Sequence, residues 1–531
     1  MDPATHDIPA VESIRASYEE TQYPGGAFTA SHPDHLRVIA ALGGFTATTS
    51  AANCRVLEIG CAIGRNLMPM AQSMPNSRFL GIDLSPRQIE IGQAVARQLG
   101  IDNLELRCQD LLDFPADEGP FDYIIAHGVY SWVPPHVRER LLQICGRSLS
   151  PGGLAYISYN TLPGWHLLGA LRDMMLFHSQ GAKNGTDRAA LSREMVKFAS
   201  QPWPLWPAYR QLMNDEQKQM ADRSDWYLLH EFVAPVNHPF HFLDFARDAA
   251  GHGLHHLGDA LTTIDKSYLL TPEMQQQLRQ FAEDDELKRQ QYLDYLGGRA
   301  FRASVLCRAD APHTPARPAM ALQQMYIAGR LTEEPAQDEA TKTPIVRFSA
   351  ADGGEFKLNL SDMGMIAAMG RISGAWPHAV QFAELLDLAT MLSPPDPQQH
   401  DPALDLARML LLAYRAGVVE LWTGPTDFIA TNLQRPHATA LARHQVAMNE
   451  DLINLRHQYL RITPTIAAMV PLMDGARDRA ALLRELTAMI DRRTLSLPGV
   501  DESAVATDSL LDTILTEFHL KSLLTGPLAQ R

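Results

Sequence analysis

Short apolar runs alternate with stretches of helical periodicity over residues 55–159. A run of about five apolar residues between turn residues is typical of a buried strand, and apolar residues three and four positions apart indicate one face of a helix. Strands that alternate with helices in this way form a parallel, doubly wound sheet, which places the segment in the α/β class. The predicted strands are Arg55–Ile59, Arg78–Ile82, Leu104–Arg107, Tyr123–Ala126 and Leu154–Ser158.

Two of the intervening helices have recognisable ends. Ser85 precedes Pro86 and stands three residues before Gln88, which is the pattern of a capped helix start, and Gly100 ends that helix. The turn sequence SPGG at 150–153 ends a later helix and leads the chain into the fifth strand.

The pattern becomes helical after residue 165. We interpret residues 165–228 as a helical insertion, interrupted by a proline-rich stretch that contains Trp203 and Trp206. The elements expected after it are an amphipathic helix at Pro239–Gly251 and the last strands of the sheet at Leu254–Leu257 and Ser267–Leu270.

The C-terminal half is predicted to be mainly helical. Polar, proline-bearing segments at Ala309–Pro318 and Thr332–Pro344 are interpreted as linkers. A DGG turn at 352–354 between two apolar runs predicts a β-hairpin, and three helices and a strand at Gly417–Trp422 are expected after it, which favours a winged-helix-like module. The expected divisions are an N-terminal cap (1–50), the sheet core (51–164), the helical insertion (165–228), the completion of the core (229–308), a linker region (309–344), the winged-helix-like module (345–430) and a C-terminal helical module (431–531).

Composition and charge narrow the class of protein. The chain has 531 residues, of which 46% are apolar and 20% charged, as in an ordinary globular protein of several domains. Acidic residues outnumber basic ones by 61 to 46, and the resulting net charge of −15 argues against nucleic acid as a partner. The five cysteines form no C-x-x-C pair, and the chain shows no signal peptide and no apolar stretch of membrane-spanning length. These features predict a cytoplasmic protein.

Six histidines lie close together in the sequence, but no H-E-x-x-H motif or cysteine partner accompanies them. We therefore expect no metal site among them. They are His230, His238, His241, His252, His255 and His256.

The most informative stretch is VLEIGCAIGRN at 56–66, an apolar strand that runs into a glycine turn and then a helix. Such a turn directs backbone N–H groups at a ligand. The spacing Gly60-x-x-x-Gly64 differs from the G-x-G-x-x-G of a dinucleotide site, and the Lys-Ser/Thr pair of a P-loop is missing. Glu58 precedes the glycines, which favours a ligand that carries a positive amino group over one that carries a phosphate.

Two further acidic residues follow the next two strands. Asp83 ends the second strand about 20 residues after the glycine turn, where a carboxylate suits the two ribose hydroxyls. Asp110 follows the third strand, where it could accept a hydrogen bond from an adenine amino group. Three carboxylates in this order describe a nucleoside with a cationic amino-acid tail, so the sequence predicts S-adenosylmethionine as the cofactor.

Further motifs stand at 18–33 (Tyr18, Tyr23-Pro24, Phe28, Ser31-His32-Pro33), 127–134 (HGVYSWVP), 159–165 (YNTLPGW), 230–240 and 301–308. Together with the acidic residues they resemble the class I S-adenosylmethionine-dependent methyltransferases. More narrowly, they resemble a bacterial subfamily with a methyltransferase regulatory region, which includes the rickettsial protein lysine methyltransferases that act on outer-membrane proteins. The resemblance covers most of residues 15–310 and is looser beyond 340, where the family carries a middle and a winged-helix region. It implies a Rossmann-like, seven-stranded sheet.

The cofactor-binding residues expected from the motifs and the resemblance lie at the ends of the strands. Ala62 stands where many members of the class have glycine. His127 is expected to contact the cofactor or to act as a base, with a structural histidine as the alternative. The full set is Glu58, Gly60, Cys61, Ala62, Gly64, Asp83, Leu84, Asp110, Leu111 and His127.

The candidate catalytic residues are Tyr18, Tyr130, Trp132 and Asn160. Aromatic faces attract a sulfonium or an ammonium, and an apolar pocket lowers the pKa of an acceptor lysine toward the neutral amine that methyl transfer needs. Tyr130 and Trp132 follow the fourth strand, where ligands bind in open α/β sheets. For each aromatic residue, packing in the core is the alternative.

The leading hypothesis is a protein lysine N-methyltransferase that transfers a methyl group in line to a neutral amine. The alternative is a small-molecule (secondary-metabolite) N- or O-methyltransferase, and a non-enzymatic adaptor is disfavoured because the three carboxylates and both loop glycines are present. The long C-terminal extension favours a protein acceptor, such as an outer-membrane or surface protein. The helical insertion is expected to form a homodimer contact or to wall a substrate channel. The modules after residue 310 contain none of the cofactor carboxylates, so they are expected to be separable from cofactor binding.

Overall fold

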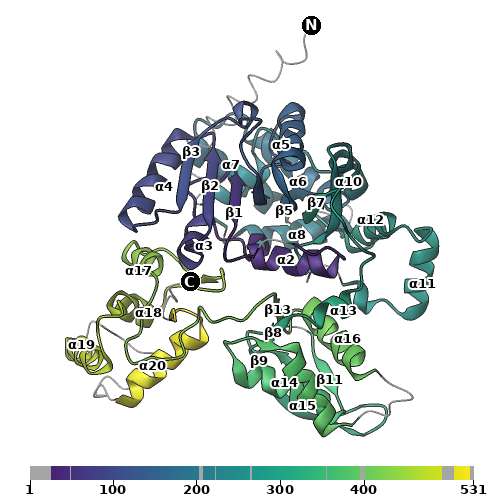
Figure 1. The fold of residues 1–531 in the computed structure, drawn as a ribbon. Coiled ribbons are helices and arrows are strands. Elements are labelled where there is room, and N and C mark those ends of the chain that lie inside the picture. Colours follow the sequence, from purple (N-terminus) through teal and green to yellow (C-terminus); the bar gives the residue numbers. More distant parts are fainter. Residues whose placement is uncertain are drawn as a thin grey trace.

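A seven-stranded sheet forms the centre of the protein in the computed structural model (Figure 1). The structure describes residues 25–47, 50–201, 207–221, 223–262, 266–354, 356–394, 401–492, 495 and 508–526. The strand order is β3-β2-β1-β4-β5-β7-β6, and β7 runs in the direction opposite to the other six strands of this sheet. The strands are β1 (Arg55–Ile59), β2 (Arg78–Asp83), β3 (Leu104–Cys108), β4 (Phe121–Ala126), β5 (Leu149–Asn160), β6 (Leu254–Asp259) and β7 (Phe301–Arg308). This is the seven-stranded, Rossmann-like α/β sheet that the motifs implied.

Local sequence patterns gave most of these elements correctly. All five strands predicted between 55 and 159 are present, and the side chain of Ser85 caps α4 (Pro86–Gln98) by accepting a hydrogen bond from the N–H of Gln88. The SPGG turn differs in one respect, because it lies inside β5, after α5 (Pro135–Ser148). The amphipathic helix is α10 (Phe242–Gly251).

The strand expected at Ser267–Leu270 is wrong. Residues Ser267–Leu269 form the 3-10 turn η6. The side chain of Thr271 then caps the start of α11 (Pro272–Phe281), so this segment leads into a helix and not into a strand. The seventh strand of the sheet is instead the antiparallel strand β7. Its six central residues are all buried, so no alternation marks it in the sequence, and a charged residue, Arg302, interrupts its apolar run.

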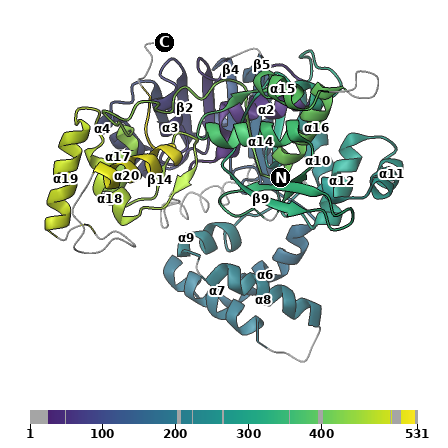
Figure 2. The same ribbon diagram turned by 90° about the horizontal axis from the view of Figure 1, so that it is seen from below.

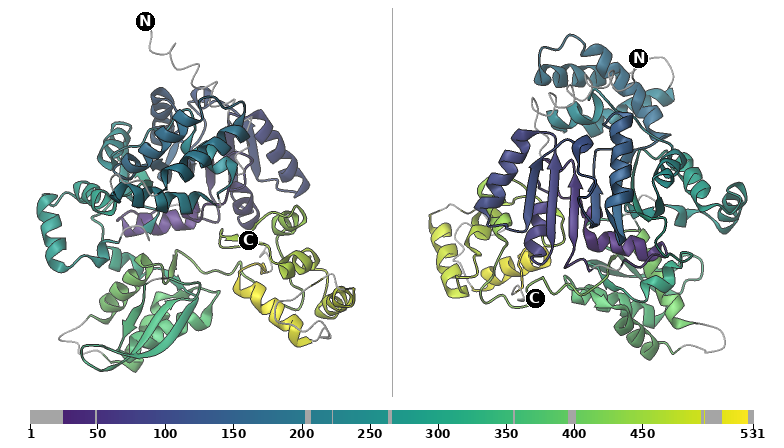
Figure 3. Two further views of the ribbon diagram at one scale, coloured as in Figure 1. Left: turned by 180° about the vertical axis from the view of Figure 1, so that it is seen from behind. Right: turned by 45° about the horizontal axis from the view of Figure 1, so that its top comes forward.

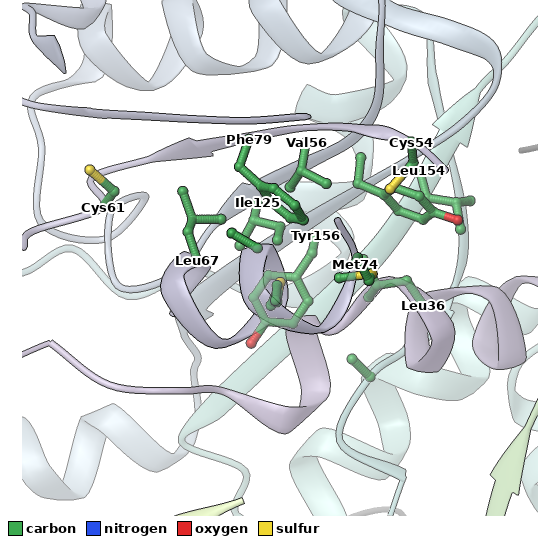
Figure 4. Packing of buried hydrophobic residues seen from close by; sticks show 14 of the residues in the cluster. Leu36, Cys54, Val56, Cys61, Leu67, Met74, Phe79, Ile125, Leu154 and Tyr156 are labelled. Carbon is green, nitrogen blue, oxygen red and sulfur yellow. The ribbon is translucent and has the colours of Figure 1, made fainter. Parts of the chain in front are cut away.

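Helices cover both faces of the sheet. On one face, α2 (Pro33–Leu42), α3 (Leu67–Ser73) and α4 pack on the strands. Figure 4 shows part of this cluster, in which Leu67 and Met74 lie near Val56, Phe79 and Tyr156 from the strands. On the other face, α5 and α10 pack on β4 and β5. Near the β6 and β7 edge, α12 (Glu286–Gly297) follows α11.

The helical insertion has a hydrophobic cluster of its own. Figure 2 shows its three long helices projecting together from the sheet domain. Trp203 and Trp206, which we singled out in the sequence, lie outside the described residues. The elements are α6 (Gly164–His178), α7 (Gly185–Ala199), α8 (Pro207–Ala221), the short α9 (Asp225–Tyr227) and a single π-helical turn, η4 (Leu228–Phe232).

Residues 318–422 form a middle module with its own core. The linker expected at Thr332–Pro344 is wrong, because Leu331–Gln337 is strand β9, which pairs with β10 (Pro344–Ala350). Pro335 is accommodated since β9 is an edge strand. The predicted hairpin is present as β10 and β11 (Leu358–Leu360). The other elements are α13 (Pro318–Leu322), β8 (Tyr326–Ala328), α14 (Met363–Ala375), β12 (Val380–Gln381), α15 (Phe382–Leu392), α16 (Pro402–Arg415) and β13 (Glu420–Trp422).

The C-terminal module is mainly helical, as expected, and also has a separate core. The middle and C-terminal modules form two lobes below the sheet (Figure 1 and the right view of Figure 3). Among the described residues, no helix combines the length and the apolar character needed to cross a bilayer. The elements of the C-terminal module are α17 (Ala440–Ala447), β14 (Leu452–Ile453), β15 (Tyr459–Leu460), α18 (Pro464–Met469), η7 (Val470–Leu472), α19 (Arg479–Asp491) and α20 (Asp508–Leu520).

Candidate functional site

A cavity opens at the carboxyl ends of β1, β2 and β4, where an open α/β sheet binds its ligands. Eight of the predicted site residues line it: Gly60, Ala62, Asp83, Leu84, Asp110, Leu111, His127 and Trp132. Glu58, Cys61, Gly64, Tyr130 and Asn160 lie behind or beside this lining, and Tyr18 lies outside the described residues.

The glycine turn after β1 has the backbone that a close ligand approach requires. Gly60 has a φ of +74°, and a Cβ there would lie 2.7 Å from a methyl group of Val129, which also lines the cavity. Ala62 adopts a φ of +51°, in the left-handed region where glycine is favoured. The side chain of Cys61 is buried in the core behind the turn, and the residue is not part of the cavity lining. Gly64, with a φ of +79°, completes the turn.

Asp83 braces this turn. The N–H of Ala62 donates to one oxygen of the Asp83 carboxylate at 2.9 Å, and the N–H of Ser85 donates to the other at 2.9 Å. The backbone of Leu84 also donates to this carboxylate, which lines the cavity and still has capacity to accept from a ligand. Asp110 accepts from the N–H of Leu112 at 2.9 Å at the start of η3 (Leu111–Asp113) and also lines the cavity.

Glu58 is an acidic group in a dry environment. Its side chain is 3% exposed, and one carboxyl oxygen accepts a hydrogen bond from Nδ2 of Asn66 at 2.7 Å. The other oxygen is buried without a hydrogen-bond partner among the described residues. Burial raises the pKa of Glu58 to about 8. A buried carboxyl with an unused oxygen next to a cavity suits a cationic ligand group, so these residues fit the amino-acid end of S-adenosylmethionine.

His127, at the end of β4, is a neutral wall of the cavity. Its ring stacks on Phe28 with centroids 3.5 Å apart, and its Nδ1 lies 2.9 Å from the hydroxyl of Tyr156. Burial lowers the pKa of His127 to about 3. A group this weakly basic is a poor acceptor for the proton of an ammonium, which argues against the role as a base and leaves cofactor contact and a structural role as the two alternatives.

Tyr130 and Asn160 are not in the cavity lining. The ring of Tyr130 is 1% exposed and packs on Tyr159, Phe240 and Phe245, which is the core-packing alternative that the sequence left open. Asn160 is buried at the end of β5 and donates from Nδ2 to the side chain of Asn237 at 3.0 Å. Trp132 is the candidate catalytic residue that lines the cavity.

Sequence reasoning missed Glu231. This residue lies on the π-helical turn η4 and lines the cavity together with His230, and burial raises the pKa of its carboxyl to about 7. Single π-helical turns occur frequently at functional sites. The motif at 230–240 contained Glu231, but no local pattern distinguishes a cavity-facing acid on a turn that packing brings to the sheet. Among the described residues, no group of three or more His, Cys, Asp or Glu is placed to hold a metal ion.

Models of known families match three segments of the chain. One described as a methyltransferase domain matches residues 56–153, and one described as a predicted methyltransferase regulatory domain matches residues 224–308. A PKMT C-terminal winged helix domain matches residues 434–527. The winged-helix match therefore falls on the C-terminal module, whereas the sequence pattern led us to expect that fold at 345–430.

The similarity to known proteins extends over nearly the whole chain. Uncharacterized protein RP789 of Rickettsia prowazekii (strain Madrid E) is 30% identical over 489 residues, which are 90% of this chain and 87% of that protein. Uncharacterized protein RP028 of the same strain is 36% identical over 236 residues, or 44% of this chain and 94% of that protein. The structure of PKMT2 from Rickettsia typhi in complex with AdoHcy has a TM-score of 0.80 at 26% identity, and the match covers 95% of this chain and 100% of PKMT2. The chain therefore belongs to the S-adenosylmethionine-dependent methyltransferases that combine a class I sheet with a regulatory domain and a C-terminal winged helix.

Proposed function

We propose that this methyltransferase is a protein lysine N-methyltransferase. The observation that carries the proposal is the extent of the likeness to PKMT2, which covers 95% of this chain and all of that one and so includes the modules outside the sheet. The PKMT-type winged helix at 434–527 supports it. A small acceptor would need a pocket, whereas these additional modules offer a surface on which a protein can dock.

The proposal also assigns the residues that contact the cofactor. S-adenosylmethionine supplies a methyl group on a positively charged sulfur. In the proposed arrangement Glu58 pairs with the amino group of the cofactor, and Asp83 accepts from its ribose hydroxyls. Asp110 lies next along the cavity, beside the apolar side chains of Leu84 and Leu111, and is proposed to accept from the adenine amino group.

The acceptor side is proposed to consist of Trp132 and Glu231. A lysine ammonium must lose a proton before its nitrogen can form the new N–C bond while the C–S bond breaks. Glu231 lines the cavity, and its pKa of about 7 makes its carboxylate a suitable acceptor for that proton near neutral pH. The indole of Trp132 offers a face to the cation before the proton is lost.

The experiment is transfer of label from S-adenosylmethionine to two fractions of a bacterial lysate, its envelope proteins and its small molecules. We expect label in protein, with mass spectrometry locating the methyl groups on lysine side chains. Asp83→Asn is the matched negative control because it alters the cofactor site without changing the size of the side chain. Label that enters only small molecules would refute the proposal and would identify the small-molecule methyltransferase instead.

A further inference from the structure

The C-terminal module reaches the cofactor loop through one hairpin. The tip of this hairpin, residues 454–458 between β14 and β15, lies against the segment that follows the glycine turn. Nε2 of His457 lies 2.7 Å from Oδ1 of Asn66, and both side chains are buried. Outside the hairpin tip, Glu450 forms an ion pair with Arg65 at 2.5 Å.

The hydrogen bonds of Asn66 determine which way its amide points. The backbone N–H of Phe28 donates to Oδ1 at 3.0 Å, and since an N–H can only donate, the oxygen must face it. Nδ2 therefore faces Glu58 and Ser31, at 2.7 and 3.1 Å. Oδ1 also meets His457, so the histidine must carry its proton on Nε2 and donate. Every donor and acceptor of Asn66 is then used, and His457 completes the set.

The same hairpin holds the segment that backs the cavity. The hydroxyl of Tyr459 accepts from the N–H of Ala27 at 3.0 Å, and the carbonyl oxygen of His457 accepts from the hydroxyl of Thr29 at 2.7 Å. Phe28 lies between these two contacts, and its ring stacks on His127 in the cavity wall. The hairpin thus contacts both Asn66, which is hydrogen-bonded to Glu58, and the segment of Phe28, whose ring stacks on His127.

Contacts of Arg456 with the middle module anchor the hairpin tip. Arg456 is 1% exposed on its side chain, forms an ion pair with Glu420 and donates to the carbonyl oxygen of Pro377. Its guanidinium lies over the rings of Trp376 and Trp422, at 4.2 and 5.2 Å from their centroids. These partners belong to the middle module, so two modules set the position of the residue that follows Arg456.

We propose that His457 is a positioning residue for cofactor binding, which acts through Asn66 to fix the carboxyl group of Glu58 and the segment that supports His127. The winged-helix module is then a part of the cofactor site and not only a docking surface. The proposal does not depend on which acceptor is methylated, so it survives if the proposed lysine specificity fails.

The test compares two variants of the full chain, His457→Ala and His457→Gln. The amide nitrogen of glutamine can replace Nε2 as a donor, whereas alanine removes the donor and leaves the Asn66 oxygen short of one hydrogen bond. Both variants share the φ of +61° at this position, so they differ in the donor and not in backbone strain. We expect the alanine variant to bind S-adenosylhomocysteine about tenfold more weakly in calorimetry, and the glutamine variant to recover most of this loss.

A second readout separates positioning from packing. The hydrogen bond from Asn66 lowers the pKa of Glu58 against the effect of burial. If His457 orients Asn66, the alanine variant will raise the pKa of Glu58 further and will move the pH dependence of binding to higher pH. A loss of packing alone would weaken binding equally at all pH values. Arg461→Gln, at an exposed position just beyond the same strand, is the matched control and should change neither quantity.

Unchanged affinity in a folded His457→Ala protein would overturn the proposal. So would an equal loss in the alanine and glutamine variants without a shift in pH dependence, because that would indicate packing. If the alanine variant does not fold, Tyr459→Phe provides the second test. Tyr459 is 48% exposed, and this variant removes the hydrogen bond to Ala27 alone, so we expect a folded protein with a few-fold weaker affinity. Wild-type affinity in that variant would contradict the role of the hairpin.

Discussion

The buried carboxyl of Glu58 makes cofactor binding depend on pH in a way that a single substitution can remove. With a pKa of about 8, this group is about 90% protonated at pH 7 before the ligand binds. A cationic amino group beside it favours the carboxylate, so binding should release a proton. Below pH 8 the free protein therefore binds more protons at Glu58 than the complex does. The affinity for the cofactor must then rise as the pH rises toward 8.

The magnitude follows from the same pKa. Ionising Glu58 in the free protein at pH 7 costs about 1.4 kcal/mol, since one pKa unit corresponds to that amount. If the carboxyl is fully ionised in the complex, the ionisation of Glu58 by itself should raise the affinity about 50-fold between pH 6 and pH 8 and add little above pH 8. Glu58→Gln mimics the neutral carboxyl at all pH values. Its affinity should lie below that of the wild type at every pH, and the ratio of the wild-type affinity to that of Glu58→Gln should grow about 50-fold between pH 6 and pH 8.

The assay is calorimetric titration with S-adenosylhomocysteine at pH 6, 7 and 8, in two buffers of different ionisation enthalpy. We expect release of nearly one proton at pH 7 from the wild type and none from Glu58→Gln. The amino group of the ligand loses its own proton near pH 8, but this affects both proteins equally, so their ratio isolates Glu58. Glu90→Gln, at an exposed position on α4, serves as the control. A wild type with flat affinity and no proton release would refute the reasoning, as would a substituted protein with the wild-type slope.

Four further changes test other parts of the structure. Asp83→Asn places an amide nitrogen against a backbone N–H group that now donates to the carboxylate. We expect calorimetry to find cofactor binding weaker by about 2–3 kcal/mol. Unchanged affinity would mean that the loop is misassigned. Phe177 on α6 is 76% exposed, and we expect it to lie in a homodimer contact of the helical insertion. Light scattering should then find monomers for Phe177→Ser, and a monomeric wild type would exclude the dimer. Asp294→Asn removes the bidentate partner of the fully buried Arg302 and leaves Asp259 as its remaining carboxylate. Urea denaturation should therefore find about 1–3 kcal/mol less stability, whereas no change would mean that Asp259 alone neutralises the charge. Ala62→Gly relieves the positive φ and should raise the unfolding free energy by about 0.5–1 kcal/mol, an effect that a loss in stability would contradict.

The elements that sequence reasoning located are those whose pattern is local. The first five strands carry apolar runs bounded by turn residues, and Ser85 caps its helix through a contact three residues away. The elements it missed depend on distant partners. β7 becomes a strand because β5 and β6 pair with both of its edges, and its buried Arg302 is tolerated because Asp294 and Asp259 neutralise it.

The candidate site divides in the same way. Gly60 and Asp83 were predictable because the turn and the end of the next strand are set by neighbouring residues, and the structure brings both to one cavity. The burial of Tyr130 was not predictable, since it depends on Phe240 and Phe245, which lie more than a hundred residues further along the chain. Glu231 escaped notice for the same reason, because packing of the insertion brings η4 to the cavity.

The expected separation of the C-terminal modules from cofactor binding rested on the absence of cofactor carboxylates beyond residue 310. The contacts give a physical reason to expect the opposite. Asp34 on α2, which is buried, accepts hydrogen bonds from Thr423, the residue directly after the middle module, and Asn66 accepts one from His457. Isolated surface contacts contribute little to stability, but a buried polar group that loses its partner costs about 1–3 kcal/mol. Removing these modules would take from Asp34 its Thr423 partner and from Asn66, the neighbour of Glu58, the hydrogen bond of His457, so the sheet and the winged helix should hold the cofactor as one unit.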